Sequence, residues 1–281
     1  MNSLAKNLLY SATATATCIA ITHTYDKKNL SNNTTTSQAE TITRPSELVL
    51  ASSLASPART ACAWAITATP ITQLPTRALS SIGPTSVISS IESLTTSLTV
   101  KHFPNLEKNS QTLLGSCIAT TITLPADVWS IITSQKNPAL PFTATKQITL
   151  NNLPKLFTIA SLRNGIWLGI AMTQREKMND IANKYSNNNP IAFESIKIGL
   201  TMGGAIPAGI LHVGLCSTVK SAYESENSHV SMKDIVKHTA KVLKKPIGVA
   251  AVSMRCLHAG IYSLTLGQIE RHDLFNFNDT K

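Results

Sequence analysis

Segments free of charged residues recur along this chain at intervals of about a hundred residues. Three of them cover residues 7–25, 109–126 and 198–219, and each is followed directly by a charged residue, in chain order Asp26, Asp127 and Lys220. As helices rising about 1.5 Å per residue, segments of this length would span a hydrocarbon core of roughly 30 Å. The chain has no run of 18 purely apolar residues, so we expect helices that turn one face toward lipid and another toward a polar interior.

Three further apolar segments alternate with these runs, and each carries one arginine in its interior. They lie near residues 50–74, 154–174 and 247–269, with Arg59, Arg163 and Arg255 respectively. One such arginine could equally stand at the mouth of a helix in a soluble protein. Because an unpaired charge at the centre of a bilayer is costly, one arginine in every such segment predicts a shared, wet cavity between the helices.

Shorter polar segments connect the members of each pair. Residues 231–245 form the clearest of them, with apolar side chains along one side and lysines along the other, which predicts a basic amphipathic helix on an anionic membrane surface. The same pattern alone also fits a solvated helix on a soluble protein. Residues 141–153 and 38–49 are weaker counterparts of this segment, and the Asn-rich stretches at 29–36 and 186–189 are interpreted as loops.

These alternations predict three repeats within a single membrane domain, residues 1–281. The predicted boundaries are 1–80 for the first repeat, 105–180 for the second and 192–272 for the third. A unit of this kind cannot bury its apolar face alone, so the repeats are expected to pack together. The predicted fold class is all-α, as a bundle of six transmembrane helices with pseudo-threefold symmetry and three short surface helices.

Composition agrees with a membrane bundle and narrows the partners. Charged residues make up 14% of the chain, against about a quarter in ordinary globular proteins. The net charge of +10 suits anionic lipid headgroups and small anionic solutes. Aromatic residues amount to 5% and do not interleave with a basic cluster, so no nucleic acid is expected as a partner.

Sequence patterns of enzymes and metal sites are missing from the chain. No GxxxxGK[ST], HExxH or GxSxG pattern occurs, so we expect neither enzymatic activity nor a cofactor. The five cysteines are far apart and include no CxxC pair, which predicts reduced, buried thiols rather than a metal site. The N-terminal segment, with Lys6 before an Ala- and Thr-rich stretch, also fits a secretory signal.

The order of these features resembles the mitochondrial carrier family, whose three repeats each end their first helix with Pro-x-Asp/Glu-x-x-Lys/Arg. The second repeat reads Pro-Ala-Asp-Val-Trp-Ser at residues 125–130, which keeps the proline and the acid. At the corresponding places the first repeat keeps the acid, Asp26, and the third keeps the base, Lys220. The resemblance covers nearly the whole chain and rests on spacing more than on any one motif.

The family's second motif, Tyr/Phe-Asp/Glu-x-x-Lys/Arg near the end of each even helix, is altered as well. Glutamine stands at every acidic position. In the family these residues gate one side of the cavity and the odd-helix ends gate the other, where Asp127 would pair with Lys220. The resemblance therefore implies gate roles for Asp26, Asp127, Lys220, Gln73, Gln174, Lys177, Gln268 and Arg271.

The resemblance also implies substrate contacts in the even helices. These are Arg59, Arg163, Arg255 and the pair Gly165 and Ile166, which is similar to a Gly-Ile pair in nucleotide-transporting members. The arginines precede the three glutamines by 14, 11 and 13 positions. At about 100° per residue, these offsets do not place all three on one helix face.

The function implied by the resemblance is transport of a small anionic metabolite, most of all a nucleotide such as ATP or ADP, by alternating access through a central basic cavity. The implied location is the mitochondrial inner membrane, which would be a host's membrane if the chain is a bacterial effector. Cardiolipin is the expected lipid partner and a monomer the expected state. The alternative is a non-transporting helical interaction or scaffold protein, secreted or attached to a membrane.

Overall fold

The computed structural model describes residues 3–32, 44–67, 76, 78–79, 81–133, 141–225 and 229–272. Within these residues the secondary structure is helical, as the sequence predicts, and no strand is formed. The elements are α1 Ser3–Asn32, α2 Pro45–Thr67, α4 Ile82–His102, α5 Lys108–Thr133, α6 Pro141–Asn151, α7 Leu153–Leu168, the π-helical turn η2 Gly169–Thr173, α8 Arg175–Ser186, α9 Pro190–Gly204, α10 Ile206–Glu224, α11 Met232–Leu243 and α12 Pro246–Arg271.

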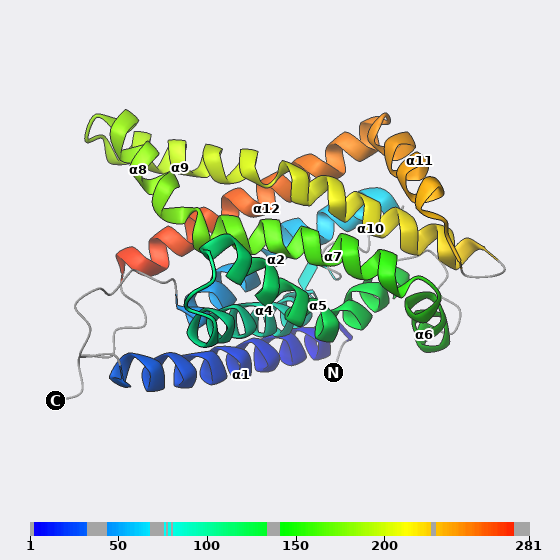
Figure 1. The fold of residues 1–281 in the computed structure, drawn as a ribbon, viewed down its shortest axis with the longest axis horizontal. Coiled ribbons are helices and arrows are strands. Elements are labelled where there is room, and N and C mark those ends of the chain that lie inside the picture. The colour runs from blue at the N-terminus through cyan, green and yellow to red at the C-terminus, as the bar shows by residue number, and fades with distance from the viewer. Residues whose placement is uncertain are drawn as a thin grey trace.

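Six long helical elements pack side by side in a closed ring (Figure 1). In ring order they are α2, α4, α5, α7, the interrupted helix α9–α10, and α12, which packs along α2 and closes the ring. The short helices α6 and α11 lie at one end of this bundle and α8 lies at the other (Figure 1). We refer to the two ends as the α11 end and the α8 end.

Helix α1 lies outside the ring, against α2 and α4. The sequence analysis expected residues 7–25 to be the first member of the bundle, whereas the packing gives that position to α2. The buried polar and thiol side chains of α1, Ser11, Cys18, Thr22 and Asp26, form one narrow stripe at helical spacing. A helix with a single buried stripe can cover a bundle from outside, but a ring member must contact neighbours on both sides.

Helix α4 fills a segment that the sequence analysis assigned to no repeat. Its buried residues are mostly Ser and Thr, which resemble a linker in composition. Their hydroxyls bond to carbonyls one turn earlier in the same helix, as Ser90 does to Ser86 and Thr96 to Glu92, both at 2.8 Å. The hydroxyl groups are thereby satisfied within the helix itself, so α4 can pack tightly and still present a polar face to the ring interior.

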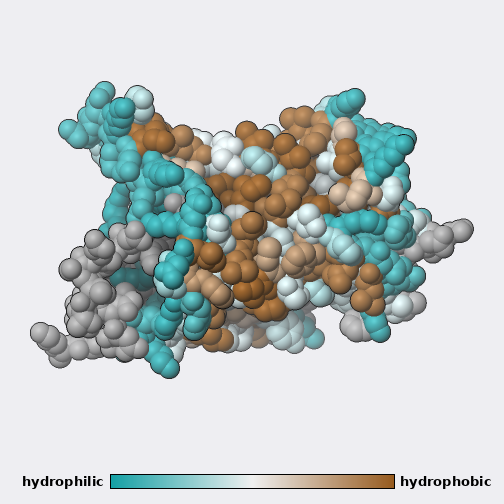
Figure 2. All heavy atoms as spheres, in the orientation of Figure 1, coloured by the Kyte–Doolittle hydropathy of each residue, from teal (hydrophilic) through white to brown (hydrophobic). Residues whose placement is uncertain are grey.

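The outer surface of the bundle is strongly apolar. Figure 2 shows an apolar band between two hydrophilic ends. Exposed large apolar side chains occur on every ring element, for example Leu54, Val87, Ile122, Leu162, Ile210 and Val249. Among the residues that the structure describes, three helices are long and apolar enough to cross a membrane, over Lys108–Ile132, Pro190–Glu224 and Pro246–Arg271. These properties are compatible with an integral membrane protein.

The interior of the ring is polar, in contrast to this surface. Apolar clusters close it at both ends: one joins α5, α6, α7, α10 and α11, and the other joins α2, α7 and α12. The described ring members bury several charged or titratable side chains, which include Glu47, Glu92, Asp127, Arg163, Lys197, His212, Arg255 and His258. Soluble proteins have the opposite distribution, because charged side chains are almost never fully buried in them unless paired.

Two neighbouring ring members are interrupted at the same level. In η2 the Gln174 amide donates to the Gly169 carbonyl at 2.7 Å, which makes the turn one residue wider than in an α-helix. Helices α9 and α10 meet at Ala205, just before Pro207. Gly204 lies against Ile170 of η2, and a Cβ at that glycine would be 3.4 Å from the isoleucine side chain. The two irregular turns therefore pack on each other.

A close backbone approach between α4 and α5 is expected to be sensitive to side-chain size. A Cβ placed on Gly115 of α5 would lie 2.8 Å from the Cα atom of Thr96 in α4. Gly115→Leu should therefore force α4 and α5 apart and destabilise the protein by about 1–3 kcal/mol or more, as overpacking does. Thermal unfolding of the purified protein in detergent measures this loss.

Gly199→Leu is the matched control for this substitution, because a Cβ at Gly199 meets no atom within 4 Å. Its melting temperature should stay the same or rise slightly, since glycine is a poor helix former. Equal melting temperatures for the two variants would contradict the close packing of α4 on α5.

The predicted basic surface helix at 231–245 is present as α11, and its first turn is capped. Ser231 accepts a hydrogen bond from the Asp234 amide at 3.1 Å and donates its hydroxyl to the Asp234 carboxylate at 2.6 Å. This bond to the carboxylate lowers the pKa of Asp234 below its ordinary value. The part of the stability that comes from the bond to the carboxylate is therefore complete only above the ordinary pKa of aspartate and is lost as the pH falls through the lowered pKa.

Ser231→Ala should remove this acid-sensitive contribution to the stability of α11. We expect a lower melting temperature at pH 7 and a difference from wild type that begins to shrink at pH 3, because protonation of the Asp234 carboxylate removes its bond to Ser231. Melting curves at both pH values check this result. A difference between the two proteins that does not shrink at pH 3 would contradict it.

Candidate functional site

The centre of the ring holds a fully buried ion pair between α7 and α5. Arg163 Nη2 lies 2.7 Å from Asp127 Oδ2, and the two side chains are 1% and 4% exposed. The side-chain oxygen of Asn164 accepts from Nε and Nη2 of the same arginine at 2.9 and 2.7 Å. Arg163 Nη1 donates to Nδ1 of His212 in α10 at 3.4 Å. One guanidinium thus joins three ring members.

A second buried arginine, Arg255 of α12, lies over an aromatic side chain. Its guanidinium carbon is 5.2 Å from the ring centre of Trp167 in α7, which is a cation–π distance. Trp167 also contacts His258 and Tyr262 of α12, with ring centres 5.0 and 4.9 Å apart. These aromatic and cationic side chains join α7 to α12, the two ring members on either side of the interrupted helix α9–α10.

A small central cavity connects these groups. It has a volume of about 10 Å³ and is lined from α2, α4, α7 and α12, by side chains that include Ser52, Glu92, Asn164, Trp167, Arg255 and His258. A cavity of this size has room for about one water molecule. The described side chains therefore leave little open space at this place, and one acid, Glu92, and one arginine, Arg255, line the cavity.

Of the predicted substrate contacts, Arg163 and Arg255 lie in the ring interior, while Gly165 and Ile166 lie elsewhere. The glycine and isoleucine line an open groove of about 330 Å³ between α5 and α7. A Cβ on Gly165 would lie 3.2 Å from Leu113 and Ser116 of α5, so the glycine serves close helix packing at its position. The side chain of Arg59, in α2, lies outside the described part of the structure.

The predicted gate at the α11 end has a different set of contacts. Asp127 binds Arg163, so a residue assigned to the gate and one assigned to substrate share one ion pair. Lys220 lies near the end of α10. Asp26, on the outer helix α1, accepts a hydrogen bond from the Ser46 amide in the first turn of α2 at 3.0 Å. Asp26 therefore caps a helix and does not face Asp127 across the ring.

The predicted gate at the α8 end contains acidic residues that the sequence analysis did not select. Arg271 pairs with Glu194 of α9 at 2.8 Å. Gln174 donates to Asn109 of α5 at 3.2 Å, and Lys177 is exposed on α8. Gln268 lies in the last turn of α12, and Gln73 lies outside the described residues. Glu194 therefore provides negative charge at this end from a position that the resemblance does not indicate.

Two further ion pairs complete this end. Arg175 of α8 binds Glu270 of α12, and Lys108 of α5 lies 4.0 Å from Glu176 of α8. Glu176 and Glu270 each follow a glutamine of the altered motif by two positions. A charge count over each motif and the residues directly after it would have found them.

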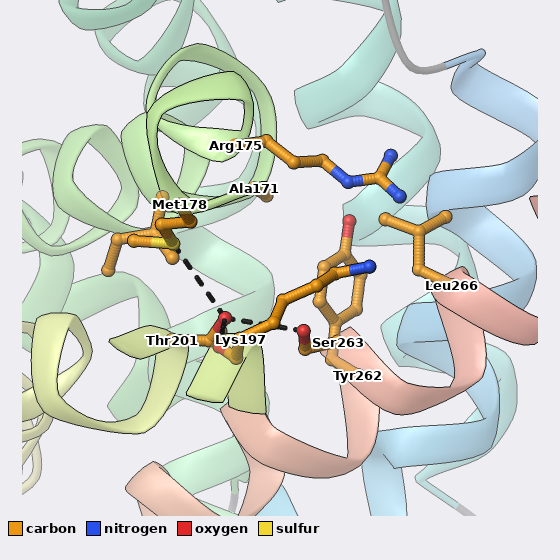
Figure 3. A pocket seen from close by; sticks show the side chains of 9 residues that line it. Ala171, Arg175, Met178, Lys197, Thr201, Tyr262, Ser263 and Leu266 are labelled. Carbon is orange, nitrogen blue, oxygen red and sulfur yellow. Dashed lines mark hydrogen bonds between the residues drawn. The ribbon is translucent and has the colours of Figure 1, made fainter. Parts of the chain in front are cut away.

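A second cavity lies just inside these ion pairs, between α8, α9 and α12 (Figure 3). It has a volume of about 20 Å³ and is lined by Arg175, Lys197, Thr201, Tyr262 and Ser263, among others. Lys197 is 5% exposed although it carries an ammonium group. The sequence analysis did not select Lys197, which directly precedes the uncharged run at 198–219.

Metal binding and family membership receive no support from the described residues or from comparison. Among the residues that the structure describes, no three His, Cys, Asp or Glu side chains gather closely enough to hold a metal ion. Comparison with protein-family models, with curated proteins and with solved structures finds no match for this chain. The mitochondrial carrier resemblance therefore stays a prediction from the sequence.

Proposed function

We propose that this chain is an integral membrane transporter whose six-membered ring crosses the bilayer and moves a small anionic solute through its centre. The observation that carries the proposal is the fully buried Arg163–Asp127 pair inside a bundle with an apolar exterior. Ionisable side chains within membrane bundles face the interior and mark the pathways of solutes, ions or protons. A structural core alone would gain little from a buried ion pair, since desolvation offsets most of its attraction.

Recognition of the solute is assigned to Arg255 and its aromatic neighbours. A guanidinium donates from a planar fork that suits phosphate or carboxylate oxygens. Arg255 lies over Trp167 and lines the central cavity together with His258. Glu92 lines the same cavity and balances part of the positive charge in the absence of solute. An incoming anion would then replace an internal carboxylate as the partner of the arginine.

Alternating access requires the ring to open at one end at a time, because the central cavity is too small for a metabolite. At the α8 end, the ion pairs Arg175–Glu270 and Arg271–Glu194 join α8, α9 and α12 and would have to separate. At the α11 end, the apolar cluster around α5, α10 and α11 closes the ring. The interrupted turns at η2 and Ala205 lie near the α8 end and provide a place where α7 and α9–α10 can bend.

In its specific form, the proposal is that the chain is a divergent member of the mitochondrial carrier family. Its substrate would be a nucleotide such as ATP or ADP, and its location would be the mitochondrial inner membrane. This form is supported by two successive units of a long helix, a short helix and a long helix: α5–α6–α7 and α9/α10–α11–α12. In the same scheme α2 and α4 form the first unit, so six spanning helices with pseudo-threefold symmetry would lie within residues 45–271. The repeat boundaries then begin later than the sequence predicts.

A non-transporting membrane scaffold is the second candidate. The observation that favours it is the size of the central cavity, which holds about one water molecule. One experiment tests membrane insertion, which both candidates require, and a second separates the candidates. Alkaline carbonate extraction should leave the protein in the membrane pellet for both. Uptake of labelled ADP, phosphate or a dicarboxylate into vesicles of phosphatidylcholine and cardiolipin should exceed that of protein-free vesicles, and saturate, for a transporter alone.

Absence of saturable uptake of every anion by folded, membrane-retained protein would overturn the transport proposal and leave the scaffold. Release of the protein by carbonate would overturn both. Saturable uptake of ADP, rather than phosphate or a dicarboxylate, would select the nucleotide form of the proposal.

A further inference from the structure

The groove between α5 and α7 lies apart from the polar centre of the ring and takes no part in the proposed transport path. Its apolar walls are formed by Leu113, Leu162, Ile166 and Ile170. Leu113 and Leu162 are 45% and 44% exposed, so the groove opens on the outer, apolar surface of the ring. Its volume of about 330 Å³ falls within the range of small-molecule sites, roughly 300–1,000 Å³.

The groove forms where α7 parts from α5. A Cβ on Gly165 would lie 3.2 Å from side-chain atoms of Leu113 and Ser116, and the Ser116 hydroxyl donates to the Ser161 carbonyl at 3.1 Å. One helical turn later, a Cβ on Gly169 would meet no atom within 4 Å. The two helices are therefore in contact at Gly165 and apart at Gly169, where the wide turn η2 begins.

The end of the groove toward α8 is polar. Gln174 donates to the side-chain oxygen of Asn109 at 3.2 Å, and both residues line the groove. Lys108, the first residue of α5, forms the exposed pair with Glu176 just beyond them. Amide and ammonium groups at one end are thus followed by aliphatic walls toward the other. A bilayer changes from headgroups to hydrocarbon in the same order.

The lining of the groove limits what can occupy it. Water needs two to four polar partners, which the aliphatic walls do not supply. An empty groove would leave those walls without dispersion contacts on one side. In the membrane-spanning arrangement proposed above, the material next to the apolar band of Figure 2 is the hydrocarbon of lipids, and the polar end lies at the level of their headgroups.

We infer that the α5–α7 groove binds one glycerophospholipid. An acyl chain fills the apolar part, and the phosphate and ester oxygens accept hydrogen bonds from the amide and ammonium groups at the polar end. The inference rests on the membrane-spanning part of the proposed function and does not depend on transport.

A lipid in this groove would contact a turn at which α7 can bend. Gly169 and Ile170 belong to η2 and line the groove. The Ile170 side chain also packs against Gly204, next to the interruption between α9 and α10. A bound chain therefore holds η2 in the present arrangement, and its departure would give α7 room to bend toward α5. This coupling to transport, unlike lipid binding itself, rests on the whole of the proposed function.

The test uses the full chain, purified and delipidated in detergent, and measures its melting temperature against added dioleoyl phosphatidylcholine. This lipid is zwitterionic, so its net charge gives no general attraction to a basic chain. The melting temperature should rise saturably, by about 5 °C or more when the lipid exceeds its dissociation constant about 100-fold. Glycerophosphocholine, which lacks the chains, and dioleoylglycerol, which lacks the phosphate, should each give a smaller rise.

Gly169→Leu places the binding in the groove. The added side chain fills the open space without a clash, and leucine is a better helix former than glycine, so the variant should fold. It should lose the rise with phosphatidylcholine. Gly199→Leu is the matched control, because its Cβ also meets no atom within 4 Å but lies on α9, and it should keep the full rise.

Leu162→Gln is a second variant that tests the wall of the groove. It should raise the half-saturating lipid concentration about tenfold, because a polar amide would replace an aliphatic contact with the chain. Leu257→Gln, on α12, is its control, since the two leucines are 44% and 43% exposed, and it should bind lipid as the wild type does. An undiminished rise in Gly169→Leu and Leu162→Gln, or an equal rise with dioleoylglycerol, would overturn the phospholipid site.

Failure of the lipid site and failure of transport give different results. A melting temperature that responds to phosphatidylcholine in a protein without anion uptake would retain the site and remove the transport proposal. Saturable anion uptake together with a melting temperature that is indifferent to the lipid would do the reverse.

Discussion

Asp127→Ala is expected to destabilise the protein by about 3–5 kcal/mol. The substitution leaves the guanidinium of Arg163 in a fully buried position without its carboxylate, and an uncompensated buried charge has a cost of that order. Thermal or denaturant unfolding of the purified protein in detergent measures the loss. Glu176→Ala is the matched control, because Glu176 and Lys108 form an exposed pair, at 56% and 53% exposure, whose loss should cost about 0–1 kcal/mol.

The double substitution Asp127→Leu with Arg163→Met separates the charge from the packing. It removes both ions and keeps similar volumes, so most of the lost stability should return. Two results would contradict a buried, mutually dependent pair. One is a loss of stability for Asp127→Ala as small as that for Glu176→Ala, and the other is a larger loss for the double substitution than for Asp127→Ala alone.

Arg255→Gln should raise the half-saturating concentration for anion uptake into vesicles by about 10- to 150-fold. The estimate corresponds to the loss of one charge-assisted hydrogen bond, about 1.5–3 kcal/mol. Arg255→Lys keeps the positive charge but not the planar fork, so an intermediate value is expected. Uptake assays over a range of anion concentrations measure the effect, with melting curves to establish that each variant is folded.

Lys241→Gln serves as the control for Arg255, since it removes one positive charge from exposed α11, away from the central cavity. Its uptake should equal that of the wild type. If Arg255→Gln transports as well as Lys241→Gln does, the central cavity is not where the anion is recognised.

The sequence predicts the fold class and much of the second half of the chain, because charge-free runs and amphipathic spacing are local properties. The α6 and α11 helices and the loop at Asn187 and Asn188, whose φ angles of 48° and 61° are positive, lie where the pattern places them. The first half is harder to predict. Helix α4 is rich in Ser and Thr, and its hydroxyls are satisfied only once the helix has formed.

The 101-residue interval between Asp26 and Asp127 illustrates the limit of spacing arguments. Asp127 lies in the ring interior, while Asp26 lies on α1 outside it. Which helices are neighbours in a ring depends on tertiary packing, which spacing along the chain does not reveal. The small side chains of α1 are compatible with a position inside or outside the ring.

The structure changes the rotation expected between Arg163 and the glutamine that follows it. Arg163 and Gln174 are separated by η2, a turn that is wider than an α-helical turn, whereas Arg255 and Gln268 lie on the uninterrupted α12. A count of residues at 100° each therefore gives the wrong rotation for α7. Arg163 and Arg255 are both buried in the ring, although their spacings from the glutamines differ.

Helix α1 begins toward the α11 end, where Ser11 lies against Gly83 at the start of α4, and it finishes at the α8 end beside Ser46. Helix α12 also finishes at the α8 end (Figure 1). The described chain therefore begins and ends at opposite ends of the bundle, and if the bundle crosses a bilayer as proposed, these two ends would face opposite compartments. Epitope tags on the two extremities would be reached by antibody from different sides of a sealed organelle, so a simple accessibility assay would report the direction of insertion.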